Sequence, residues 1–157
     1  MSFNIRQLFK KRKQVKPTMS YRFIKGLIEK FASRINAPVN LLPTYEHSED
    51  FARPHIEIDV DNNLHFVVIE RGKEIERRKT AELEELIYWV FEGITLTMAF
   101  DYEVKNRKQN QDPRIIAFNK QLELLNTIDS KLGHKCKQKQ EKILLDAPYS
   151  DINDKKL

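Results

Sequence analysis

Apolar residues recur at helical spacing in the first strongly patterned part of the chain, residues 20–36. Their spacing of three or four residues predicts an amphipathic helix, with Ser20 as its N-cap and Pro38 just beyond its end. The apolar stripe of this helix consists of Phe23, Ile24, Leu27, Ile28, Phe31 and Ile35. The next stretch, LLPTYEHSEDFARP (41–54), is polar with prolines near both ends, which is typical of an irregular connection.

Three stretches in the middle of the chain are typical of β-strands. They are HIEIDV (55–60), which alternates apolar and acidic positions, the more fully apolar LHFVVIE (64–70), and KEIERRK (73–79). A three-residue loop at 61–63 and a two-residue loop, Arg71-Gly72, would connect them as an antiparallel meander. The cross-strand pairs expected from these loops are Val60–Leu64, Ile58–Phe66, Ile56–Val68, Glu70–Lys73 and Val68–Ile75.

Two or three helices are expected in the rest of the chain. Thr80 is a natural N-cap for a long helix, and Pro113 is a suitable first residue for the next one. A break at Leu132-Gly133 precedes a last segment rich in lysine and glutamine. The long helix has one apolar stripe of Leu83, Leu86, Ile87, Val90, Phe91, Ile94, Met98 and Tyr102, and a second face of Trp89, Leu96, Ala99 and Phe100.

The predicted fold class is α+β: an N-terminal helix, a three-stranded antiparallel β-meander, then two or three helices packed on one face of the sheet. We expect residues 1–18 to form a flexible basic arm, residues 19–150 a single domain, and residues 151–157 a loose tail.

Composition and charge narrow the class of protein. The 157 residues are 40% hydrophobic and 32% charged, so the chain can bury a core. The net charge of +5 belongs to the arm, which has six basic residues and no acid, while the remaining chain has 22 basic and 23 acidic residues. A single cysteine excludes an intrachain disulfide, and no apolar run reaches the ~18 residues of a membrane span. These features predict a cytoplasmic protein that does not contact membranes.

The search for catalytic chemistry favours no enzyme, metal site, cofactor or small-molecule ligand. The chain has no phosphate-binding glycine loop and no GxSxG, HExxH, CxxC or EF-hand pattern. Cys136 has no base placed beside it by the sequence, and a metal site at His55 and His65, which could approach across a hairpin, would need a third ligand. Glu85 and Glu92 lie seven residues apart in the long helix, a spacing that would suit acid–base work. The favoured interpretation makes Glu92 a structural polar anchor instead.

Basic residues offer an alternative function. The arm and the run HKCKQKQEK (134–142) could bind phosphates, but neither is interleaved with the aromatic residues that stack on bases. A nucleic-acid-binding or regulatory module that uses the arm is therefore the second hypothesis.

Four stretches, taken in order, resemble a known family. They are NAPVNLLPTYEHSEDFARPHIEID, HFVVIERGKEIERR, ELIYWVFEGITLTMAFDYEVKNR and DPRIIAFNKQLELL, of which RPHIE, ERG and YWVFEG are the most specific parts. Over roughly residues 30–149 the chain resembles immunity protein 63, a family of bacterial polymorphic toxin and contact-dependent growth inhibition systems. The resemblance implies a small, non-catalytic cytoplasmic antitoxin that binds the C-terminal domain of a cognate toxin. Many such toxins are nucleases, but the nearly neutral body of this chain does not indicate phosphate mimicry.

Two surfaces are candidates for the toxin interface. The first is the connection between the prolines, whose preorganisation would lower the entropy cost of binding. Its candidate residues are Tyr45, Glu46, Glu49, Asp50, Phe51 and Arg53. The second is the solvent-facing side of the meander, with Glu57, Asp59, Glu74, Glu76 and Arg78. For both surfaces, ordinary solvated polar residues are the competing interpretation.

Overall fold

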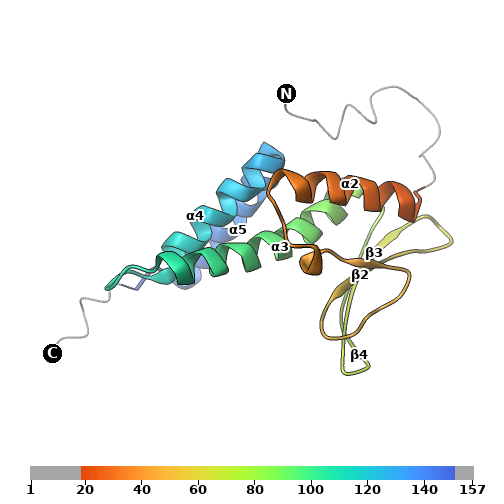
Figure 1. The fold of residues 1–157 in the computed structure, drawn as a ribbon, viewed down its shortest axis with the longest axis horizontal. Helices are drawn as coiled ribbons and strands as arrows, with labels where there is room; N and C mark the ends of the chain where they lie inside the picture. Colours follow the sequence, from red (N-terminus) through yellow and green to blue (C-terminus); the bar gives the residue numbers. More distant parts are fainter. Residues whose placement is uncertain (1–18, 151–157) are drawn as a thin grey trace. The chain divides into compact units, whose positions relative to one another are not determined.

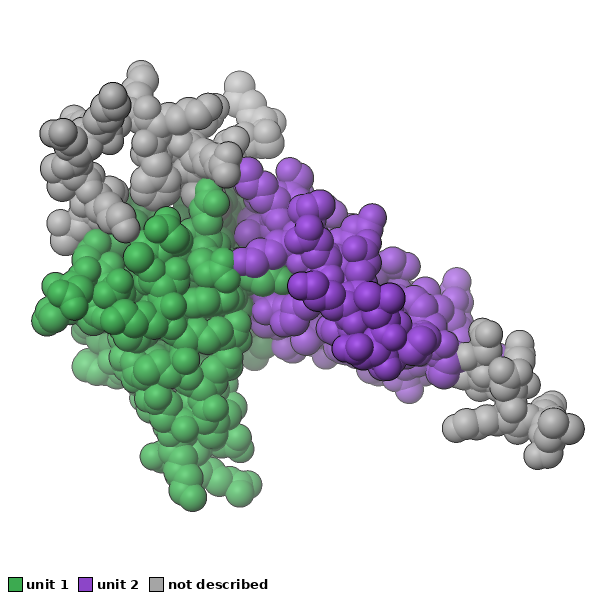
Figure 2. Space-filling view, turned by 180° about the vertical axis from the view of Figure 1, so that it is seen from behind, with its two compact units in different colours: residues 1–91 green, residues 92–157 purple. Residues whose placement is uncertain are grey.

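The structure is a computed structural model that describes residues 19–150. The chain divides into two compact units, one ending at Phe91 and the other beginning at Glu92 (Figure 2). The predicted basic arm, 1–18, and the tail, 151–157, lie outside the described residues. A single domain over residues 19–150 stays a prediction.

The first unit contains a helix followed by a sheet (Figure 1). Its elements are α2 (Tyr21–Arg34), the 3-10 helix η1 (Val39–Leu41), β1 (Thr44–Tyr45), β2 (Pro54–Ile58), β3 (Leu64–Glu70), β4 (Lys73–Thr80) and the first turns of α3 (Leu83–Asn106). The second unit contains the rest of α3, then α4 (Pro113–Ile128) and α5 (Ser130–Asp146). The α+β class is thus confirmed, with three helices after the sheet.

The sheet has four strands in the order β1-β2-β3-β4, so the prediction of a three-stranded meander is wrong in one respect. β2, β3 and β4 are antiparallel neighbours as expected, but β1 adds a parallel edge strand beside β2. A strand of two residues is too short to show any periodicity. The expected irregular connection therefore contains both η1 and β1.

The first hairpin differs from the prediction by a shift of two residues. Ile56 pairs with Phe66 and Ile58 with Leu64, which leaves a five-residue turn, Asp59–Asn63. A shift of two keeps every side chain on its predicted face, because strand side chains alternate with period two. Val60, expected opposite Leu64, lies in the turn instead and is 102% exposed.

The second hairpin has the predicted loop but not the predicted register beyond it. Glu70 pairs with Lys73, and Arg71 and Gly72 both have positive φ (52° and 72°), the geometry of a two-residue hairpin turn. Val68, however, pairs with Glu76 because a β-bulge shifts the register between Val68 and Ile69. Ile75 is the extra residue of the bulge and is exposed rather than paired with Val68.

Helix α2 and one face of the sheet supply the core of the first unit. Ser20 caps the helix by accepting a hydrogen bond from Phe23 N (3.2 Å), as predicted. The Phe31 ring meets the Phe91 ring of α3 edge to face, with 6.0 Å between the ring centroids. Apart from the exposed Phe23, the predicted stripe of α2 is buried, together with Ile56, Leu64, Phe66 and Val68 of the sheet.

Helix α3 begins later than predicted. Thr80 is the last residue of β4, and its hydroxyl accepts a hydrogen bond from Glu82 N (3.0 Å), while the helix itself starts at Leu83. The predicted apolar stripe is buried from Leu83 to Ile94. Beyond that point Tyr102 of the stripe is exposed, and so are Leu96 and Phe100 of the predicted second face.

The second unit is built around the hairpin of α4 and α5, which lie side by side (Figure 1). Pro113 is the first residue of α4, as predicted, and Asp129 is both the C-cap of α4 and the N-cap of α5. The predicted break at Leu132-Gly133 is wrong, because α5 runs through both residues. Gly133 instead allows close packing: a Cβ there would lie 2.0 Å from Asn126 Oδ1 of α4. Among residues 19–150, no helix is long and apolar enough to span a membrane.

Candidate functional site

The connection from β1 to β2 forms a loop with an unusual backbone. Three consecutive residues, Asp50, Phe51 and Ala52, have φ values of 62°, 55° and 58°, and Glu46 has 66°. This left-handed region favours glycine and is tolerated by asparagine and aspartate, whereas other residues there cost roughly 1–2 kcal/mol each. The loop adopts this conformation without a glycine, so other contacts must hold it.

Hydrogen bonds to the β3–β4 hairpin hold the loop. Asp50 Oδ1 accepts from Phe51 N (2.9 Å), and Asp50 Oδ2 accepts from Gly72 N (3.1 Å). Ala52 N donates to Ile69 O (2.9 Å), which ties the far side of the loop to β3. The loop is thereby fastened to the end of the sheet at both its aspartate and its alanine.

The six predicted loop residues separate into outward-facing and supporting groups. Glu46, Glu49 and Phe51 are exposed, and Phe51 is 91% exposed. Arg53 supports the loop from within: its Nε donates to Leu42 O (2.9 Å) and its Nη1 to Glu49 (2.5 Å). Tyr45 packs against Tyr21 of α2, with ring centroids 6.5 Å apart, and burial raises the pKa of its hydroxyl.

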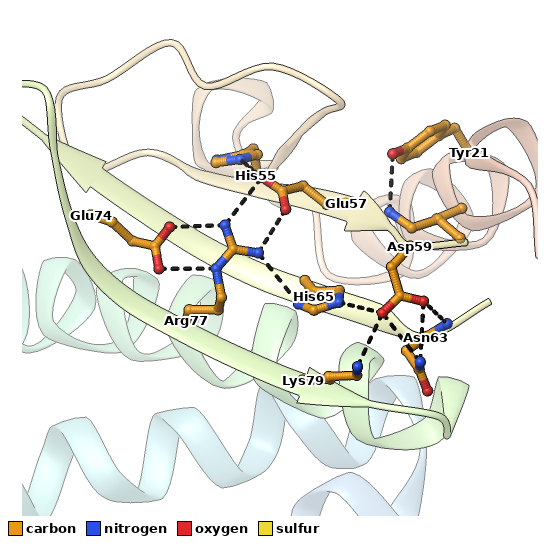
Figure 3. A network of polar contacts seen from close by, with 10 residues as sticks. Tyr21, His55, Glu57, Asp59, Asn63, His65, Glu74, Arg77 and Lys79 are labelled. Atoms are coloured by element: carbon orange, nitrogen blue, oxygen red, sulfur yellow. Dashed lines mark hydrogen bonds and ion pairs between the residues drawn. The ribbon is translucent and has the colours of Figure 1, made fainter. Parts of the chain in front are cut away.

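The outer face of the sheet carries a network of polar contacts centred on Arg77 (Figure 3). The Arg77 guanidinium donates to Glu57 Oε2 of β2 (2.7 Å) and to both carboxylate oxygens of Glu74 (2.8 and 2.9 Å). Arg77 Nη1 also lies 3.3 Å from His65 Nδ1. Because arginine only donates, Nδ1 accepts, and His65 carries its hydrogen on Nε2.

Asp59 connects the same network to the first turn. It accepts from His65 Nε2 (2.9 Å) and Lys79 Nζ (3.1 Å), and its other oxygen accepts from Asn63 N (2.9 Å). The chain of contacts therefore runs across three strands, from Glu57 through Arg77 and His65 to Asp59 and Lys79. We call these residues, with His55 and Glu74, the outer-face network.

The electrostatics of the outer-face network suit fixed charges rather than proton transfer. The hydrogen bond from Arg77 lowers the pKa of Glu57, and hydrogen bonding to Arg77 lowers that of Glu74. The hydrogen bond from His65 lowers the pKa of Asp59, helped by those from Asn63 and Lys79. All three carboxylates are therefore ionised at neutral pH, whereas a general acid needs a raised pKa.

The five residues predicted on the solvent-facing side of the meander divide between the two sides of the sheet. Glu57, Asp59 and Glu74 join the outer-face network, but Arg78 pairs with Phe66 and lies over its ring, 5.0 Å from the centroid. Arg78 Nε donates to Glu76 (2.5 Å), which pairs with Val68 on the same inner side. The bulge at Ile75 explains the error, because it reverses the alternation between Glu74 and Glu76.

The histidines do not form a metal site in the described part of the chain. His55 pairs with Val67 and His65 with Glu57, so the two rings do not face each other across the hairpin. Within residues 19–150, no group of three or more potential ligands could hold a metal ion. His55 is 2% exposed; its Nε2 lies 2.9 Å from Glu57 Oε1, and its Nδ1 is buried without a hydrogen-bond partner.

In the second unit, Glu92 and Cys136 lie in a polar interior between helices. Glu92 is buried and forms an ion pair with Lys139 of α5, and its backbone carbonyl accepts from Gln121 of α4 (3.2 Å). This position suits the anchor role expected of Glu92, which stays a prediction. Burial raises the pKa of the Cys136 thiol to about 11, so it is a poor nucleophile at neutral pH.

Two members of the outer-face network, Arg77 and Lys79, were missed by sequence reasoning, and so was Asn63 in the turn beside it. Arg77, Lys79 and Asn63 bond to carboxylates that the sequence did single out. The alternation of His55, Glu57 and Asp59 indicates which side chains of β2 lie on the outer face. In β4 the bulge interrupts the alternation, so the sequence does not indicate which side chains lie there. The left-handed backbone of the loop carries no signal at all, since none of its residues is glycine.

Comparison with protein families gives one match. The model of the immunity protein 63 family matches residues 61–142, more than half of the chain. ERG and YWVFEG lie within this range, while RPHIE and the loop that precedes it lie outside. No curated protein and no solved structure matches the chain.

Proposed function

Because the chain belongs to the immunity protein 63 family, we propose that it neutralises a cognate toxin domain by binding it in a stoichiometric complex. The observation that carries the proposal is the family match over residues 61–142, which includes β3, β4, α3 and α4. An immunity protein requires a partner whose activity it blocks. We propose that this partner is the C-terminal domain of a toxin.

The chemistry of the described residues supports binding rather than catalysis. The carboxylates of the outer-face network are held ionised by their partners, and the Cys136 thiol has a raised pKa. Glu92 forms an ion pair with Lys139. These groups are suited to presenting fixed charge or to supporting the fold.

Two surfaces of the first unit are proposed for the contact. One is the β1–β2 loop, where Glu46, Glu49 and Phe51 are exposed. The other is the outer-face network, in which Arg77 and its partners display paired charges across the strands. Paired charges cost less to desolvate than isolated ones, so this face can enter an interface without leaving a buried unpaired charge.

The test is neutralisation of the toxin domain encoded by the adjacent gene. We expect cells that express this domain to grow only when the chain is co-expressed. In a titration of the purified toxin domain, its activity should fall linearly and end at one chain per toxin. Size-exclusion chromatography with light scattering should give the mass of that complex. A chain without residues 1–18 should protect equally, because the arm has no part in the proposed contact.

Three outcomes would contradict the proposal. An adjacent gene without a toxin domain, or no protection by the full chain, would remove its basis. Complete inactivation by far less than one chain per toxin would point to catalysis. Loss of protection on removing the arm would favour the hypothesis based on the basic residues of that segment.

A further inference from the structure

The β1–β2 loop keeps an aromatic side chain in water at a conformational cost. Phe51 lies between two other residues in the left-handed region, and its own φ is 55°. For a bulky residue such a φ is a genuine outlier, and strained backbone of this kind clusters at ligand clamps and binding sites. The Phe51 side chain is 91% exposed, so it adds no buried apolar area to stabilise the first unit.

The loop is also held in one arrangement before any partner binds. Asp50 bonds to Phe51 N and, across the sheet end, to Gly72 N, while Ala52 N donates to Ile69 O. Arg53 adds hydrogen bonds to Leu42 O and Glu49. These bonds leave the loop little freedom to lose on association, so more of the contact energy of Phe51 appears as affinity.

The charges beside Phe51 restrict what can bind there. Glu46 and Glu49, each with a side chain more than half exposed, lie on the same loop. Glu49 is paired with Arg53, and Glu46 and Asp50 leave the loop with a net negative charge. Nucleic acids and lipid headgroups of the cytoplasmic leaflet are anionic and would be repelled by them. A lone aromatic ring also lacks the apolar area that a membrane anchor needs. A protein surface with an apolar pocket and a cationic rim is the complementary partner.

We propose that Phe51 is the anchor of the toxin interface, inserting into an apolar pocket of the toxin domain whose cationic rim faces Glu46 and Glu49. This inference rests on the proposed function, since it names the chemistry of the partner of that same complex. The pattern is typical of interfaces, in which a few buried aromatic residues supply most of the binding energy and rim charges speed association.

The test measures binding of purified variants to the toxin domain encoded by the adjacent gene, by calorimetry and by association kinetics. Phe51→Ala should weaken binding about thirtyfold or more, while Phe51→Leu, which keeps an apolar side chain, should weaken it less. Val60→Ala is the matched control: it also removes a fully exposed apolar side chain beside β2, and it should change the Kd by less than about twofold. Glu46→Lys should slow association at low salt, and high salt should abolish the difference.

The outcomes separate this inference from the proposed function. If the unaltered chain does not bind the toxin domain, the proposed function fails. If it binds and Phe51→Ala binds as tightly as Val60→Ala, Phe51 is not the anchor. If Phe51→Ala leaves toxin binding intact but changes the mass of the chain alone in light scattering, the ring contacts a second copy, which also overturns the inference. Thermal unfolding of Phe51→Ala and Val60→Ala should match that of the unaltered chain, because neither the Phe51 ring nor the Val60 methyl groups are buried.

Discussion

The two connections that flank β2 are organised alike and differ in backbone strain. Each has an aspartate that accepts hydrogen bonds, Asp50 in the β1–β2 loop and Asp59 in the β2–β3 turn. Each also presents one exposed apolar residue, Phe51 in the loop and Val60 in the turn. In the turn, however, the only residue with positive φ is Asn62, a type that tolerates this region. In the loop, four residues have positive φ: Glu46, Asp50, Phe51 and Ala52.

This difference shows how two exposed side chains can have different significance. Val60 is exposed because a five-residue turn at no particular cost places it outside the sheet. Phe51 is exposed although its backbone is strained and its ring gains no burial. Exposure alone says little about function, since much of any protein surface is apolar. Exposure held by a strained and hydrogen-bonded backbone is the stronger indication of a contact site.

Of the substitutions in these two connections, Asp50→Ala should change the free energy of unfolding most. The substitution removes the acceptor for Gly72 N and places alanine in the left-handed region, so the free energy of unfolding should fall by about 2 kcal/mol. Urea denaturation followed by fluorescence measures it. Asp61→Ala, in the β2–β3 turn and on the surface, is the control and should change stability by less than about 0.5 kcal/mol. Equal stabilities of the two variants would mean that Asp50 does not hold the loop.

A smaller effect of opposite sign is expected for Ala52→Gly. Ala52 is exposed and has a φ of 58°, so glycine relieves strain there and should raise the free energy of unfolding by about 1 kcal/mol. Ala81→Gly is the control, because Ala81 is also exposed but does not have positive φ, and that variant should be slightly less stable. If both substitutions destabilise the protein to the same extent, the loop is not strained.

Periodicity predicted the elements of the first unit well and their register less well. The stripe of α2 and the alternation of β2 follow from burial of one face, which is a local property of the sequence. The two-residue shift of the first hairpin arises because Asp59 bonds to Asp61 N and Asn63 N, which closes a longer turn than the DNN signal indicated. The bulge at Ile75 and the two-residue strand β1 likewise depend on neighbouring strands rather than on a pattern of their own.

The candidate site shows the same division. The proline-flanked polar stretch was enough to identify the β1–β2 loop, including Phe51, as a possible contact. Its left-handed backbone could not be foreseen, because the bonds that impose it come from Gly72 and Ile69, some 20 residues further along the chain. Arg77 was missed for a related reason: its partners lie on β2 and across the bulge, and only the folded sheet brings Glu57 and Glu74 to one guanidinium.

The smallest effect is expected for Asp59→Asn in the unstrained β2–β3 turn, and it should depend on pH. Hydrogen bonds from His65, Asn63 and Lys79 hold the pKa of Asp59 below its ordinary value of about 3.9. A lowered pKa in the folded state means that the stabilisation is complete above the ordinary value and is lost as pH falls through the folded value. Asp59→Asn should therefore lower the Tm at pH 7, and its difference from the unaltered protein should narrow towards pH 3.

Glu57 and Glu74 titrate in the same direction, but they are present in both proteins and cancel in this difference. The effect should be modest, because the Lys79 partner is more than half exposed and solvent screens the pair. Thermal melts at several pH values, with Asp61→Asn as a surface control, measure the gap. If the Tm difference between Asp59→Asn and the unaltered protein stays constant from pH 7 to pH 3, Asp59 organises the turn without its charge. The two connections would then differ in backbone strain but not in how their aspartates act.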